Sequence, residues 1–287
     1  EVIFAKYKNP FELDKYVREL TQDKSKRFYV FIDEVQLVLE MQNPYVEGVE
    51  DKIGFVPVLL GLMKLKNVDL YVTGSNSKML SKDIVTNFRD RGSEITVFPL
   101  SFTEYCSVSD MEKMDALEEY MMYGGMPLSV IEKDELEKKK YLLSLHNNVF
   151  VKDITERYNL KDDVLLSSLI DILYSSVGSL TNTHKLANTA ESVMKIKSSD
   201  NTIKKYLDYL EDSFLLESAQ RYDIKGRAYI ETPKKFYFSD MGLRNARINF
   251  RQFEQTHAME NVIYNELRMR GYKVDVGVVT ISEKDEN

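Results

Sequence analysis

Two adjacent carboxylates, Asp33 and Glu34, directly follow an uninterrupted apolar run, residues 28–32. Such a run of β-favouring residues is typical of a strand that is buried on both faces of a parallel sheet. Ligands of open α/β sheets bind beyond the carboxyl ends of the strands. In enzymes that hydrolyse ATP, an Asp at that place holds Mg²⁺ and a Glu orients the attacking water. The pair therefore predicts a magnesium-nucleotide site; the alternative is a turn or helix cap, because Asp-Glu is a common dipeptide.

A second apolar run, residues 68–72, also ends in polar residues, among them Ser75 and Asn76. An expected helix at 53–66 separates the two runs, which together form a βαβ pattern. Either polar side chain could contact the γ-phosphate or the attacking water from the end of the second strand. Such residues also form ordinary turns, so a role at the nucleotide site is indicated only by their position after the acidic pair in the sequence.

Arg89 and Arg91 follow a further expected helix that runs to about residue 88. An arginine here could stabilise the charge that develops on the transferred phosphoryl group. If that phosphoryl group were bound to a neighbouring subunit, the protein would be a homo-oligomer. The alternative is that both arginines form surface salt bridges. The Gly-Lys-Ser/Thr of a phosphate-binding loop does not occur in the sequence. Because Glu1 already reads as the inside of a strand, we expect that loop upstream of it.

After a short expected strand at 94–98, Ser101 and Glu104 have the spacing of a helix capping box. Helical patterns continue to about residue 163, broken at Gly124-Gly125-Met126-Pro127, and suggest a helical lid over 103–163. Three further helices and a two-stranded hairpin are expected within 164–250. This order predicts a winged-helix form of the helix-turn-helix unit.

The winged-helix segment, 165–250, holds 12 Lys and Arg against 10 Asp and Glu, in a chain of net charge -7. Basic residues flank the expected recognition helix and the wing tip, where phosphates of DNA would be contacted. They are Lys195, Lys197, Lys204, Lys205, Lys225 and Arg227. Protein docking or a solvated surface is the alternative role of this segment.

The last expected helix, 256–270, carries Glu260 and Glu266 and is followed by a strand pattern. Surface glutamates are the default interpretation. The single cysteine, Cys106, cannot form an internal disulfide, and no apolar run reaches the length of a membrane span. We therefore expect a cytoplasmic protein. The acidic net charge excludes nucleic-acid or anionic-membrane binding by the molecule as a whole.

Several strings resemble the prokaryotic AAA-type ATPases that carry a C-terminal domain of unknown function. They are FIDEVQ at 31–36, VTGSNS at 72–77, RDR at 89–91, FPLSFTEY at 98–105, YFSDMGLR at 237–244 and ENVIYNEL at 260–267. By this resemblance Asp33 and Glu34 are the Walker B pair, Ser75 or Asn76 is the sensor, and Arg91 is the arginine finger. The family usually has Gly where this chain has Asp90. The resemblance also suggests that 251–287 begins a restriction-endonuclease-like region.

The predicted fold is therefore α/β: an incomplete P-loop-type parallel sheet (1–102), the helical lid (103–163), the winged helix (164–250) and the start of a nuclease-like region (251–287). The predicted function is ATP binding and hydrolysis with Mg²⁺ on Asp33, coupled to the winged helix. The alternative is a DNA-binding or protein-docking winged-helix protein with a degenerate ATPase fold.

Overall fold

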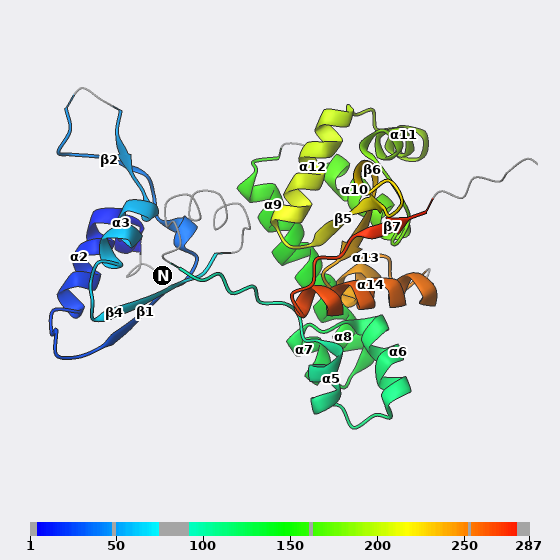
Figure 1. Ribbon diagram of the computed structural model, residues 1–287, viewed down its shortest axis with the longest axis horizontal. Helices are drawn as coiled ribbons and strands as arrows, with labels where there is room; N and C mark the ends of the chain where they lie inside the picture. Colours follow the sequence, from blue (N-terminus) through cyan, green and yellow to red (C-terminus); the bar gives the residue numbers. More distant parts are fainter. Residues whose placement is uncertain (1–4, 48–49, 75–91, 161–162, 252–253, 280–287) are drawn as a thin grey trace, which may run out of the picture. The chain divides into compact units, whose positions relative to one another are not determined.

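The computed structural model describes residues 5–47, 50–74, 92–160, 163–251 and 254–279. The chain divides into two compact units, residues 1–95 and 96–287. Figure 1 shows the helices and strands of each unit. Arg89 and Arg91, Ser75 and Asn76, and the helix expected up to residue 88 lie outside the described residues.

The first unit is built around two parallel strands, β1 (Phe28–Ile32) and β4 (Val68–Val72), paired from Phe28 with Val68 to Ile32 with Val72. The connection between them contains α3 (Phe55–Leu62), which confirms the predicted βαβ order. The other elements of this unit are η1 (Lys6–Lys8), α2 (Pro10–Leu20), η2 (Val35–Leu37), β2 (Met41–Gln42) and β3 (Lys52–Ile53). Helix α2 begins where Asn9 accepts hydrogen bonds from the backbone N–H groups of Phe11 and Glu12.

Helices α2 and α3 cover only one face of the β1–β4 pair. Val30, Ile32 and Leu70 on that face pack with Leu13 of α2 and Leu62 of α3. On the opposite face the side chains of Tyr29, Phe31 and Tyr71 are 60%, 74% and 46% exposed. The prediction that this strand is buried on both faces was therefore wrong for the described residues. The rings of Phe31 and Tyr71 stack on each other instead, with centroids 4.9 Å apart.

Two other boundaries differ from the predictions. Helix α3 starts later than residue 53 because Lys52 and Ile53 pair as β3 with β2, and it ends at Leu62 rather than at residue 66. The strand expected at 94–98 does not form: these residues belong to no strand, and Ile95 and Val97 are exposed. A β-favouring sequence becomes a strand only where a partner accepts its backbone hydrogen bonds, and none of the described residues does so here.

The second unit begins with helices. They are α5 (Phe102–Val108), α6 (Lys113–Tyr123), α7 (Pro127–Ile131), α8 (Glu135–Ser144), the π-helical segment η4 (Leu145–Val151) and α9 (Lys152–Arg157). The predicted capping box is present: the Ser101 hydroxyl accepts the backbone N–H of Glu104, and the Glu104 carboxylate accepts the backbone N–H of Ser101 at 2.8 Å. The predicted break at Gly124 separates α6 from α7.

Three more helices and a hairpin follow. The helices are α10 (Asp163–Ser175), α11 (Thr183–Met194) and α12 (Asp200–Asp212), and the hairpin pairs β5 (Leu216–Asp223) with β6 (Ala228–Phe238) in antiparallel fashion. A single bridge joins Thr181, between α10 and α11, to Lys234 of β6. The unit ends with α13 (Met241–Arg247), α14 (Gln255–Met269) and β7 (Val276–Val278), which pairs in parallel with β5.

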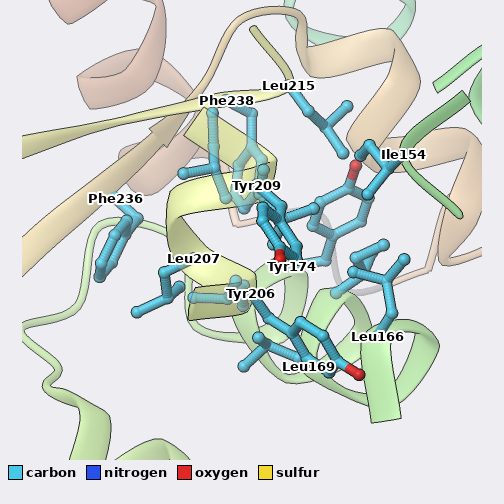
Figure 2. Packing of buried hydrophobic residues seen from close by; sticks show 14 of the residues in the cluster. Ile154, Leu166, Leu169, Tyr174, Tyr206, Leu207, Tyr209, Leu215, Phe236 and Phe238 are labelled. Carbon is cyan, nitrogen blue, oxygen red and sulfur yellow. The ribbon is translucent and has the colours of Figure 1, made fainter. Parts of the chain in front are cut away.

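One large hydrophobic cluster lies where α10, α11 and α12 meet the hairpin. Tyr174 of α10 and Phe238 of β6 are each 1% exposed, and their rings meet edge to face with centroids 4.4 Å apart. Leu166 and Leu169 of α10 join the same cluster, as does Tyr209 of α12 (Figure 2). Apolar burial of this kind contributes roughly 25 cal/mol per Å², so this cluster is the main core of the second unit.

Candidate functional site

Asp33 and Glu34 lie at the carboxyl end of β1, beside the carboxyl end of the parallel strand β4. The backbone pairing continues past the last paired residues: Thr73 donates its N–H to the Ile32 carbonyl at 2.9 Å, and Val35 donates to the Thr73 carbonyl at 3.0 Å. The two strands therefore hold Asp33 and Thr73 side by side. This is the edge at which open parallel sheets bind ligands.

Thr73 links the two acidic residues. Its hydroxyl donates a short hydrogen bond to Oδ1 of Asp33 and accepts the backbone N–H of Glu34 at 3.0 Å. Sequence reasoning concentrated on Ser75 and Asn76 and gave Thr73 no role. The sequence could have indicated Thr73, because it directly follows Val72, the last residue of β4, just as Asp33 directly follows Ile32.

Glu34 has a left-handed backbone conformation with φ of 50°. This region is uncommon for residues other than glycine and is often found at functional sites. The side chain is half-buried, and the amide Nε2 of Gln36 donates a short hydrogen bond to its Oε2. Each carboxylate thus accepts a hydrogen bond from a neighbouring side chain, and Asp33 is the more exposed residue of the two.

The donor set suits Mg²⁺ bound together with a nucleotide better than a cation held by protein alone. Among the described residues, no three His, Cys, Asp or Glu side chains come together as metal ligands. Mg²⁺ in nucleotide sites is commonly held by one or two carboxylates, water and the substrate phosphates. Asp33 can supply one such oxygen. The predicted sensor and finger residues, Ser75, Asn76, Arg89 and Arg91, lie outside the described residues.

The six basic residues predicted to contact DNA lie in two parts of the second unit. Lys195 and Lys197 lie between α11 and α12, and Lys204 and Lys205 lie on α12; all four are exposed. Lys225 and Arg227 lie in the turn of the β5–β6 hairpin and are also exposed.

Two acidic residues at the end of α12 point away from solvent. Asp212 is only 6% exposed and accepts a hydrogen bond from the Tyr158 hydroxyl at 3.0 Å. Burial raises the pKa of the neighbouring Glu211. Of the other acidic residues of α12, Asp200 is exposed and Asp208 is half-buried, so Lys204 and Lys205 share the surface of this helix with carboxylates.

The two glutamates of α14 are engaged in structural contacts. Oε1 of Glu260 accepts hydrogen bonds from Lys235 at 2.7 Å and from the Tyr237 hydroxyl at 2.6 Å. Oε1 of Glu266 accepts the backbone N–H of Phe102 at 2.7 Å, at the start of α5. These contacts join α14 to β6 and to α5.

Two known domain families match different parts of the chain. Residues 3–106 match a family described as an AAA domain, and residues 114–254 match a separate domain of unknown function. The chain therefore belongs to a family of AAA-type P-loop ATPases that carry a separate domain of unknown function. AAA domains are nucleotide-binding, and the mixed α/β structure fits a P-loop fold.

Two relatives extend along nearly the whole chain. An uncharacterized protein of Haemophilus influenzae is 34% identical over 283 residues, which cover 97% of this chain and 67% of that protein. The uncharacterized protein MJ1544 of Methanocaldococcus jannaschii is 26% identical over 268 residues, covering 89% of this chain and 56% of that protein. Among the residues that the structure describes, no helix is long and apolar enough to cross a bilayer.

Proposed function

We propose that the protein is an ATPase in which Asp33 holds the Mg²⁺ of bound ATP and Glu34 orients the attacking water. The observation that carries the proposal is the position of both residues at the carboxyl edge of the β1–β4 pair, within the segment that matches an AAA domain. The Mg²⁺ that Asp33 would hold supplies positive charge, which would stabilise the negative charge that develops on the transferred phosphoryl group.

The residues of this chain would divide the work as follows. The Thr73 hydroxyl, by donating to Asp33, fixes the carboxylate that faces the cation. Gln36 holds the Glu34 carboxylate from the side, so the carboxylate keeps a defined direction toward water. Ser75 or Asn76 would sense the γ-phosphate, and Arg91, with Arg89 as the alternative, would act as the finger in a homo-oligomer.

The test is the Glu34→Gln substitution in the full-length protein. Glutamine keeps the shape of the side chain but cannot accept a proton, so we expect ATP binding to persist and turnover to fall by about 100-fold. Glu40→Gln is the matched control, because Glu40 is an exposed glutamate six positions further along the chain. ATP affinity is measured by calorimetry and turnover by phosphate release. Unchanged turnover in Glu34→Gln would remove this residue from the mechanism.

The second candidate function is nucleic-acid binding through a winged helix formed by α10, α11, α12 and the β5–β6 hairpin. Its support is the order of three helices and a hairpin, together with the single-residue bridge from Thr181 to Lys234, which ties the segment between α10 and α11 to β6. ATP binding or hydrolysis in the AAA domain would then change the affinity of the winged helix for DNA.

The specific observation in its favour is the charge on the exposed surface of α12. Lys204 and Lys205 face solvent, while Asp212, at the end of the same helix, is buried. Lysines in this position can contact phosphates, and each contact makes binding more sensitive to salt.

A titration of labelled duplex DNA at several salt concentrations tests this second function. Replacing Lys204 and Lys205 by Gln should weaken binding and reduce the slope of log K against log salt by about 2. The control replaces two exposed lysines by Gln: Lys113, at the start of α6, and Lys133, between α7 and α8. Binding that is equally weakened in both variants, or that does not respond to salt, would contradict phosphate contacts by α12. A protein partner would then remain as the use of this surface.

A further inference from the structure

Helix α13 is a seven-residue helix without an exposed face. Its residues from Met241 to Ala246 are all buried, including the polar side chains of Arg244 and Asn245. Buried polar groups need hydrogen-bond partners, because leaving one unsatisfied costs about 1–3 kcal/mol. The partners of these side chains are backbone groups at the ends of other helices.

Arg244 closes the carboxyl end of α10. Its Nε and one terminal nitrogen donate to the Tyr174 carbonyl at 2.9 and 2.7 Å. The last carbonyls of a helix have no partner inside the helix, and a cation there also complements the helix dipole. Arg247, at the end of α13, forms a second link to α10 through Asp171 at 2.7 Å and the Ser167 hydroxyl at 2.5 Å.

Asn245 closes the carboxyl end of α6 in the same way. Its side-chain amide donates to the carbonyls of Met121 and Met122 at 3.1 and 2.8 Å. Its Oδ1 accepts a hydrogen bond from Arg244 at 2.9 Å. The two capping side chains are therefore bonded to each other as well as to α6 and α10.

Asp240 holds the beginning of α13 against the turn that follows α6. Its carboxylate accepts the N–H of Leu243 at 3.0 Å, as a helix cap, and the N–H of Gly125 at 2.7 Å. The backbones approach so closely that a Cβ on Gly242 would lie 2.0 Å from the Tyr123 carbonyl oxygen. Only glycine can occupy this position without displacing the α6 end.

We propose that α13 is an interlock that joins the helices before residue 160 to the three-helix and hairpin segment, so that the two parts unfold and move as one body. The interlock is independent of the ATPase proposal, because none of its residues lies in the first unit. It assigns a structural role to Asp240 and Arg244, which belong to the string at 237–244 that the sequence left without a function, and to Asn245, which follows that string. It also implies that the helices over 103–163 do not open as a separate lid against α10.

The experiment is hydrogen exchange of the 287-residue chain, read by mass spectrometry on peptides from α6 and α10. In the unchanged protein both peptides should exchange through the same opening event. Leu210→Ala, a core change in α12 that leaves the hydrogen bonds of α13 in place, should accelerate both peptides by the same factor.

Asn245→Asp places a carboxylate oxygen where the amide donated to two carbonyls, so it breaks the link to α6 at constant size. Exchange of the α6 peptide should then rise about tenfold or more relative to that of the α10 peptide. If this variant does not fold, Asn245→Ala removes the same two hydrogen bonds without adding a charge. The interlock is refuted if Leu210→Ala accelerates the α10 peptide alone, or if the substitution at Asn245 accelerates both peptides equally.

Discussion

The buried carboxylate of Asp240 gives the stability of this protein a pH dependence of unusual sign. Asp240 is 3% exposed, and burial raises its pKa to about 6 from an ordinary value of 3.8. The N–H groups of Gly125 and Leu243 favour the ionised form but do not offset the loss of hydration. Between these two pKa values the folded protein binds more protons at this residue than the unfolded chain does. The contribution of Asp240 to stability therefore increases as pH falls from 7 toward 4.

The magnitude follows from the two pKa values. The full difference corresponds to about 3 kcal/mol, of which about 1.3 kcal/mol is gained between pH 7 and pH 5. An asparagine side chain cannot titrate, so the Asp240→Asn variant lacks this gain, although the lost hydrogen bond to one N–H group lowers its stability at every pH by about 1–3 kcal/mol.

Urea unfolding of both proteins at pH 7 and pH 5 measures the effect, because the other titrating groups cancel in the difference between them. The free-energy difference between the parent and Asp240→Asn should widen by about 1.3 kcal/mol at pH 5. A difference that stays the same at both pH values would show that the hydrogen bonds outweigh burial and that the pKa of Asp240 is not raised.

Three further changes test other parts of the structure. Thr73→Val removes the hydroxyl that donates to Asp33 and should lower ATP turnover of the full-length protein by about tenfold, whereas Thr73→Ser should preserve it; equal turnover in the two variants would contradict the role of this hydroxyl. Gly242→Ala forces a Cβ against the Tyr123 carbonyl and should cost about 3 kcal/mol or more in urea unfolding, while Gly92→Ala, which meets no atom within 4 Å, should change little. Burial lowers the pKa of His146 to about 4, so its contribution to stability is complete above pH 6.5 and falls by about 3 kcal/mol toward pH 4. The difference in unfolding free energy between the parent and His146→Phe should therefore shrink in that range. A difference that stays constant would contradict a neutral buried histidine.

Short sequence patterns were sufficient to predict several helices and strands. Ser101, three residues before Glu104, predicted a helix start that the structure confirms, and Asn9 before Pro10 is a local start signal of the same kind. These caps involve residues only a few positions apart, so their geometry depends little on the rest of the fold. The parallel pairing of β1 and β4 was also predicted, because a helix separates two apolar runs.

Contacts between distant residues were not predictable in the same way. The bond from Thr73 to Asp33 depends on the register of two strands, and the caps by Arg244 and Asn245 join residues about 70 and 120 positions apart. The exposure of Phe31 could not be foreseen either, because it depends on which face of the sheet the helices cover. Sequence periodicity describes a segment, whereas these features belong to pairs of segments.

The left-handed backbone at Glu34 bears on which substitutions can be interpreted at this position. Glycine or asparagine would adopt a φ of 50° more easily than glutamate does, so either could make the chain fold more readily while removing the carboxylate. A gain in stability and a loss of turnover would then arise from one change, for two unrelated reasons. Glutamine has nearly the same backbone preference as glutamate, so replacing Glu34 by Gln isolates the chemistry of the acid from the conformation of the chain.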